Sequence, residues 1–133
     1  MNIAISSAPR YLSCVTQLFH PESDQIQLGA VLAALGDDTR LAVVAHIARS
    51  ETGSAICRSF GHITSKSNLT YHVGKLREAG VVRVVPDGTR RIVSIRRDDL
   101  DRLFPGLLAA ILARVPPDFG ADIAADWDEE TAA

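Results

Sequence analysis

The chain has 133 residues, of which 47% are hydrophobic and 5% are aromatic, so it can form one domain with an aliphatic core but is small for an enzyme with a deep cleft. The sequence contains no run of 18 apolar residues, so no membrane-spanning helix is expected. The first residues lack the pattern of a secretory signal, and two cysteines are too few for a disulfide framework. We therefore expect a cytoplasmic protein. The net charge of −2 hides an asymmetry, because residues 65–97 carry eight basic and two acidic side chains while residues 118–133 carry six acidic and no basic ones.

Three regions are expected along the chain. Residues 1–24 have only a weak apolar pattern and are predicted to form a peripheral arm, residues 25–116 to form the domain, and residues 117–133 to form an acidic, disordered tail. The domain opens with a predicted helix over 26–35, in which apolar side chains recur at three- and four-residue spacing until Gly36.

The next elements predict a helix-turn-helix. Asp37 and Asp38 can cap a helix over 39–49, which is apolar nearly all round and therefore expected at the centre of the domain. A third, shorter helix is predicted over 54–60, with Ala55, Ile56 and Phe60 facing inward. A brief break over 61–64 then separates it from a polar, basic helix.

That basic helix, over 65–79, has one apolar stripe formed by Leu69, Val73 and Leu76, which must face inward. Its first eleven residues hold two lysines, one histidine and no acid. An ordinary amphipathic surface helix would instead carry charges in opposite-sign pairs, so the pattern favours a helix that enters the DNA major groove with its N-terminal residues leading.

A basic β-hairpin follows. Two β-branched runs, 81–85 and 91–95, bracket Asp87-Gly88, which is a strong hairpin signal because glycine supplies the positive φ of the turn. Arg90 and Arg91 leave the turn where they could reach a phosphate or a minor groove, so we interpret the hairpin as a wing; ion pairs with Asp98 and Asp99 are the alternative use of its arginines.

A last helix is predicted over 106–115, with Pro105 at an early helical position. Its apolar stripe is too wide for a small domain to bury alone, which favours a dimer, although the helix could also fold back on its own core. The predicted dimer interface combines it with the first helix and contains Leu28, Val31, Leu32, Leu35, Leu107, Leu108, Ile111, Leu112 and Val115.

Three segments together resemble the ArsR-type family of winged helix-turn-helix repressors: LAALGDDTRLAVVAHIA, SKSNLTYHVGKLREAGVVRV and DGTRRIVSIRRDDLDRLFPGLL. The resemblance implies a mainly α fold with a small β-hairpin (α+β), and a homodimer that binds an inverted-repeat operator in double-stranded DNA and is released by an effector. With the wing included, the predicted DNA-binding residues are Ser65, Lys66, Ser67, Asn68, Thr70, Tyr71, His72, Lys75, Arg90 and Arg91, of which His72 and Lys75 are expected nearer the backbone.

The signal that such a regulator would sense is left open by the residues. Metal-sensing relatives carry clusters of cysteine, histidine or aspartate, and Cys57 with His62 does not make the three or four ligands that zinc needs, so no metal and no cofactor is expected. Cys57 is expected to be a small buried hydrophobe or, alternatively, a redox switch partnered by Cys14. A metal-responsive repressor with an atypical site is a further alternative.

Two other classes of function fit the sequence less well than a DNA-binding regulator. Catalysis would need a nucleophile with its base, or paired carboxylates. The candidate carboxylates, Asp37 and Asp38, are better explained as a helix cap, and the candidate pair Ser65 and His72 as DNA-facing groups. No enzyme is therefore expected. A winged-helix module that binds protein rather than DNA is the second alternative, and the salt dependence of binding would distinguish it from a DNA-binding regulator.

Overall fold

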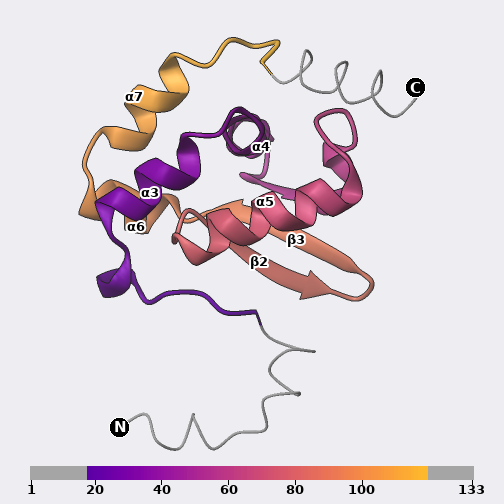
Figure 1. Ribbon diagram of the computed structural model, residues 1–133, viewed down its shortest axis with the longest axis horizontal. Coiled ribbons are helices and arrows are strands. Elements are labelled where there is room, and N and C mark those ends of the chain that lie inside the picture. Colours follow the sequence, from indigo (N-terminus) through magenta and orange to yellow (C-terminus); the bar gives the residue numbers. More distant parts are fainter. Residues whose placement is uncertain (1–17, 120–133) are drawn as a thin grey trace, which may run out of the picture.

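The computed structural model describes residues 18–119, which form helices packed on a three-stranded antiparallel sheet (Figure 1). The elements are η1 (Ser23–Gln25), α3 (Leu28–Leu35), α4 (Asp38–Ala48), β1 (Ser54–Ile56), η2 (Cys57–Phe60), α5 (Lys66–Glu78), β2 (Val82–Asp87), β3 (Arg90–Ile95), α6 (Arg97–Leu103) and α7 (Leu107–Ala113). This order confirms the predicted α+β winged helix fold. Cys14 and nearly all of the acidic tail lie outside the described residues.

Helix α4 lies at the centre of the domain, as its apolar sequence predicts. Val43, Val44 and Ile47 are fully buried, and α4 contacts α3, α5, β1 and β3. The helix begins where Asp37 accepts a hydrogen bond from the backbone N–H of Arg40 (3.1 Å), which confirms the predicted cap. The core is therefore organised around a helix whose start is fixed by a side chain.

The predicted short helix over 54–60 is wrong in its first half. Ser54–Ile56 form β1, which pairs antiparallel with β3 from Ser54 opposite Ser94 to Ile56 opposite Ile92, and only Cys57–Phe60 form a helical turn, η2. Pairing with β3 satisfies backbone groups that a helix would have satisfied locally. Phe60 is fully buried as predicted, whereas Ala55 and Ile56 are half-buried in the sheet.

The β2–β3 hairpin is longer than predicted. The strands pair from Val82 opposite Ile95 to Asp87 opposite Arg90, so the turn consists of Gly88 and Thr89 alone. Gly88 has a φ of 65°, which confirms the role predicted for the glycine. The sheet order is β1-β3-β2, and the hairpin extends away from the helices at one end of the molecule (Figure 1).

Helix α5 ends at a glycine that the packing requires. Gly80 has a φ of 87°, its N–H donates to the carbonyl of Arg77 (3.0 Å), and a Cβ at this position would lie 2.5 Å from Cγ1 of Ile26. The predicted start of the first helix at Ile26 is consequently wrong. Ile26 is extended and buried against Gly80, and α3 begins two residues later.

The C-terminal helices also depart from prediction. Arg97–Leu103 form α6, a helix that lies between the predicted hairpin and the predicted last helix. Pro105 does not start the last helix: Gly106, with a φ of 81°, forms its N-cap, and α7 runs only from Leu107 to Ala113. The left-handed glycine lets the chain turn between α6 and α7. Pro105 therefore lies between the two helices and not inside either of them.

Residues 18–22, which we term the N-terminal strap, are tied to the domain by three hydrogen bonds. Arg77 donates to the carbonyl of Phe19 (2.9 Å), the backbone N–H of Val84 donates to Nε2 of His20 (3.0 Å), and Arg96 donates to the carbonyl of Pro21 (2.7 Å). The strap thus joins the end of α5, β2 and the end of β3. This part of the predicted peripheral arm is an integral part of the domain.

Candidate nucleic-acid interface

The first turn of α5 presents short polar side chains and one lysine to solvent. Lys66, Ser67 and Asn68 are exposed, while Ser65 is the N-cap and its hydroxyl accepts a hydrogen bond from the backbone N–H of Asn68 (3.3 Å). Leu69, Val73 and Leu76 are buried, which confirms the predicted inward stripe. The helix is therefore anchored by one face and leaves its N-terminal turn free.

The next turn of α5 extends this exposed face. The Tyr71 side chain is 58% exposed, and Nζ of Lys75 lies 5.5 Å from the centre of its ring, within reach of a cation–π interaction. Thr70 is exposed, and its hydroxyl donates to the carbonyl of Lys66 (3.1 Å), which leaves oxygen lone pairs free to accept. An aromatic ring, a hydroxyl and an ammonium group thus share one surface.

His72 lies edge-on against the Tyr71 ring, with 5.2 Å between the ring centres, and reaches from α5 to the start of α4. Its Nδ1 is 3.2 Å from Nη1 of Arg40 and 3.9 Å from the Asp37 carboxylate, both at the start of α4. Burial lowers the pKa of His72, the Asp37 carboxylate opposes this shift, and the Arg40 guanidinium adds to it. His72 therefore joins α5 to the cap of α4, and Arg40 is a partner that no local sequence pattern indicated.

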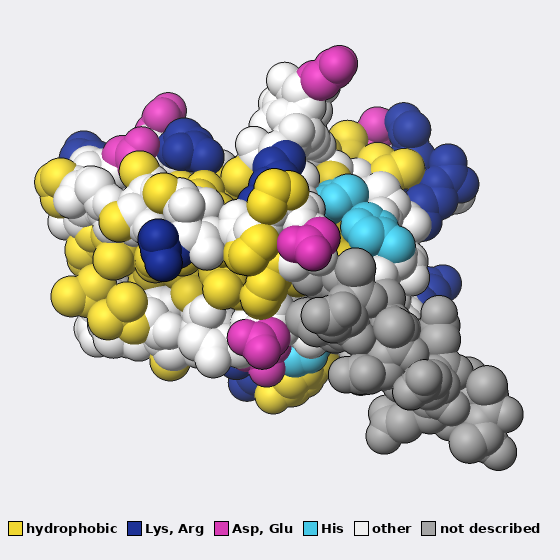
Figure 2. Space-filling model, turned by 90° about the horizontal axis from the view of Figure 1, so that it is seen from above, with side chains coloured by type: hydrophobic (Ala, Val, Ile, Leu, Met, Phe, Trp, Pro, Cys, Tyr) yellow, Lys and Arg dark blue, Asp and Glu magenta, His cyan; other side chains and the backbone are white. Residues whose placement is uncertain are grey.

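The hairpin carries two exposed arginines, Arg90 and Arg91, at the start of β3. Arg90 donates to the Asp87 carboxylate across the turn (3.3 Å), an exposed pair that costs little to open. Figure 2 shows basic side chains gathered at the right-hand end of the molecule, which is the end of the hairpin tip and of the start of α5 in Figure 1.

Not all of the positive charge counted between residues 65 and 97 is available to a ligand. Arg96 is only 7% exposed, and it pairs with the Asp99 carboxylate (3.0 Å) in addition to binding Pro21. This pairing is the alternative that the sequence offered for the wing arginines. Arg77 is likewise half-buried and engaged by the N-terminal strap.

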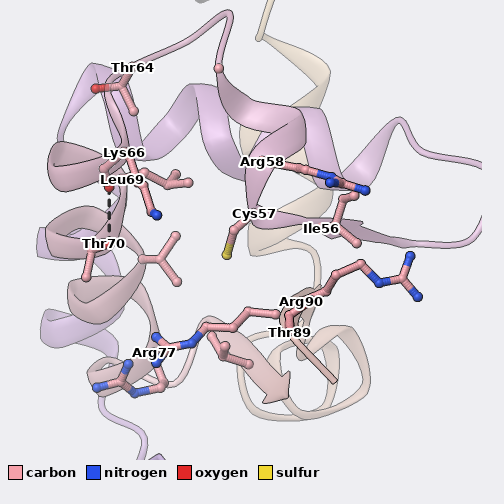
Figure 3. Close-up of a pocket in the computed structure, with 14 residues that line it drawn as sticks. Ile56, Cys57, Arg58, Thr64, Lys66, Leu69, Thr70, Arg77, Thr89 and Arg90 are labelled. Atoms are coloured by element: carbon pink, nitrogen blue, oxygen red, sulfur yellow. Dashed lines mark hydrogen bonds between the residues drawn. The ribbon is translucent and has the colours of Figure 1, made fainter. Parts of the chain in front are cut away.

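A groove of about 760 Å³ separates α5 from the hairpin. Figure 3 shows the Cys57 sulfur pointing into it, between Lys66, Leu69 and Thr70 on one side and Thr89 and Arg90 on the other. Arg58 and Arg77 also line the groove, and neither was predicted as a site residue. Arg58 lies on η2, which the pairing of β1 with β3 brings beside α5.

Cys57 is half-buried, and burial raises the pKa of its thiol, although the nearby Arg91 guanidinium opposes the shift. A raised pKa lowers the fraction of reactive thiolate at neutral pH. The position therefore favours the small hydrophobe over the redox switch, and its candidate partner Cys14 lies outside the described residues.

The predicted dimer residues divide into two groups. Leu28 and Leu32 are 45% and 46% exposed, and Leu107, Ile111 and Leu112 are half-buried. Val31, Leu35, Leu108 and Val115 are buried within the chain itself. In Figure 2, apolar side chains gather at the left-hand end, where α3 and α7 lie in Figure 1, opposite the basic end.

Two further properties concern only residues 18–119. No three or more His, Cys, Asp or Glu side chains of this part are grouped so that they could hold a metal ion. None of its helices is long and apolar enough to cross a membrane.

The fold and this surface define a winged helix-turn-helix domain, and comparison with known proteins agrees. Residues 35–85, from the end of α3 through α4 and α5 into β2, match the family described as Helix-turn-helix domain. Over 93 residues the chain is 32% identical to YceK of Bacillus subtilis (strain 168), an uncharacterized HTH-type transcriptional regulator; the match covers 66% of this chain and 88% of that protein. The chain belongs to the helix-turn-helix family.

Proposed function

We propose that the protein is a DNA-binding transcription regulator that reads a specific sequence with α5 and holds the adjacent backbone with the β2–β3 hairpin. One observation carries the proposal. An exposed, acid-free face of α5 lies at the same end of the molecule as a hairpin tip with two adjacent arginines. A helix fits the major groove, and arginines beside it can bind phosphates or enter a minor groove.

The exposed side chains differ in what they can contact. We assign to base edges the exposed side chains that are short, aromatic or close to the N-terminus of the helix. These are Lys66, Ser67, Asn68, Thr70 and Tyr71. Lys75, Arg90 and Arg91 are assigned to phosphates. Ser65 and His72 support the interface from within, Ser65 by capping α5 and His72 through its contacts with α4.

We further infer that the regulator is a repressor and acts as a homodimer on an inverted repeat. The exposed Leu28 and Leu32 of α3 and the apolar residues of α7 support a two-fold contact at the end opposite to the basic one. Such an axis would set two copies of α5 on major grooves roughly 34 Å apart. The relative's name as a transcriptional regulator supports the same class of function.

The test is fluorescence anisotropy with a labelled duplex from the region upstream of the protein's own gene and a scrambled duplex of equal length. We expect tighter binding to the upstream duplex and a steep loss of affinity with salt, because each phosphate contact releases a counterion. Lys66→Ala and Tyr71→Ala should reduce the preference for the upstream duplex, whereas Arg90→Ala should weaken binding to both duplexes alike, by about tenfold.

Arg114→Ala is the matched control, because it removes one exposed positive charge from the C-cap of α7. Its binding should equal that of the unmodified protein. Absence of binding to the upstream duplex at low salt would contradict the proposed function, and an equal loss from all three site variants would contradict the division between base and phosphate contacts.

A further inference from the structure

The groove between α5 and the hairpin combines two surfaces that differ in chemistry. Apolar side chains that line it, which we term its floor, include Cys57, Leu69, Val73 and Val84. Its walls are basic. The five cationic side chains that line it are Arg58, Lys66, Arg77, Arg90 and Arg91, and none of its described lining residues is acidic.

Contact with DNA accounts for the walls but not for the floor. A phosphodiester needs cations and N–H donors, and it gains nothing from contact with buried aliphatic side chains. The Cys57 thiol belongs to the apolar part as well, because burial raises its pKa and keeps it neutral. The floor therefore offers an apolar contact that a ligand with an apolar body can use and a phosphodiester cannot.

We propose that this groove binds a small amphipathic anion, an apolar body that carries one carboxylate or a similar acidic group, and that the bound molecule competes with DNA. The apolar body would lie over Cys57, Leu69 and Val84, and the acidic group would pair with Arg91 or Lys66. A groove of about 760 Å³ falls in the range of small-molecule sites.

Competition follows from the shared cations. Lys66, Arg90 and Arg91 line the groove and also belong to the proposed DNA-binding surface. A ligand carboxylate there neutralises charge that the phosphates need, and the ligand body fills the space between α5 and the wing. This regulatory half of the inference rests on the proposed function, whereas ligand binding itself does not.

Isothermal titration calorimetry on the full chain, without DNA, tests the binding. Decanoate is the probe, held below the concentration at which it forms micelles. Acetate carries the charge without the apolar body, and decanol carries the body without the charge. We expect decanoate to bind more tightly than either, because only decanoate satisfies both the floor and the walls.

Two variants locate the site. Arg91→Ala changes an exposed side chain and should weaken decanoate binding about three- to tenfold. Cys57→Phe should abolish it by filling the floor, while Cys57→Ala, which leaves the groove open, should weaken it far less; circular dichroism checks that each variant is folded. Decanoate that binds no more tightly than acetate or decanol, or that binds the folded Arg91→Ala variant with unchanged affinity, overturns the proposal.

A competition titration separates this inference from the proposed function. Decanoate should release the labelled upstream duplex from the unmodified protein, whereas acetate at equal concentration should not. If the protein binds DNA and decanoate together, the competition is refuted while the regulator remains. If decanoate binds at the groove but no DNA binds, the proposed function fails while the ligand site remains.

Discussion

Gly80 is the residue at which the end of α5, the following strand and the extended residue Ile26 meet. Its φ of 87° is unfavourable for any residue with a Cβ, and the space that a Cβ would need is occupied by Ile26. We expect Gly80→Ala to destabilise the fold by about 2–3 kcal/mol, from backbone strain together with displacement of Ile26. Chemical denaturation monitored by circular dichroism measures this free energy of unfolding.

Gly74 provides a control, because its substitution should change the free energy of unfolding in the opposite direction. It lies inside α5, and a Cβ there would have no other atom within 4 Å. Gly74→Ala should therefore stabilise the protein by about 0.5–1 kcal/mol, because alanine favours the helix and restricts the unfolded chain. Equal effects of the two substitutions would show that Gly80 is not under the constraint described.

The charged residues show what sequence reading could and could not reveal about the candidate site. The exposed Lys66 and Tyr71 follow from the helical period alone, because the buried stripe of α5 fixes the opposite face. Arg96 counted as part of the basic segment, yet it is buried beside Asp99 and Pro21. A partner 75 residues away cannot be inferred from the local pattern, so the sequence alone overestimates the positive charge available near the wing.

The N-terminal strap depends on an uncharged histidine. Nε2 of His20 accepts a hydrogen bond from Val84, so a protonated ring would lose this bond. Burial lowers the pKa of His20, and the Arg83, Arg77 and Arg96 guanidinium groups lower it further, against a hydrogen bond to Leu18 that raises it. The strap is thus held by a group whose protonation the folded structure opposes.

Acidification should weaken the fold through this contact. Because the pKa of His20 is lower in the folded than in the unfolded chain, its contribution is fully present above about pH 6.5 and is lost as the pH falls through the folded value. Burial also lowers the pKa values of His46 and His72, which act in the same direction. We expect Tm to fall between about pH 7.5 and pH 5.5, and to fall less in His20→Gln, which keeps an acceptor that does not titrate.

His20→Phe separates titration from hydrogen bonding. It removes both the acceptor and the charge, so its Tm should be lower than that of His20→Gln at about pH 7.5, with an equally shallow dependence on pH. Thermal unfolding followed by circular dichroism supplies all of these values. An identical fall of Tm in His20→Gln and the unmodified protein would refute the role of His20.

The elements that sequence reading predicted well are those whose signals are local. Helices α4 and α5 combine a 3.6-residue period with a side-chain cap, and the hairpin is marked by Gly88. Strand β1 has only three residues, and its strand character comes from pairing with β3 nearly forty residues later. The break between α6 and α7 depends on the left-handed Gly106, which Pro105 obscured.

The molecule as a whole has a basic end and an apolar end, which suits a regulator that binds DNA with one and its second copy with the other (Figure 2). We expect Leu32→Glu to convert the proposed dimer into a folded monomer, because the side chain is 46% exposed on α3 and a carboxylate is costly in an apolar interface. Sedimentation equilibrium measures the mass, and DNA anisotropy should show a matching loss of affinity.

Phe19→Ser is the control for that substitution. Phe19 is 62% exposed in the N-terminal strap, and its carbonyl, which binds Arg77, is unchanged by the substitution. The variant should keep the mass and the DNA affinity of the unmodified protein. A dimer that persists in Leu32→Glu would place the contact between subunits elsewhere.

The hydrogen bond between His20 and Val84 also affects whether the sheet can pair with a strand of another molecule. Strand β2 is an outer strand of the sheet, and such strands readily pair with strands of other molecules. His20 occupies the outward N–H of Val84, and two residues further along the same edge Pro86 has no N–H to offer. The His20 side chain and Pro86 therefore prevent another strand from pairing with this edge. Protonation of His20 would make the edge available for such pairing and so for aggregation.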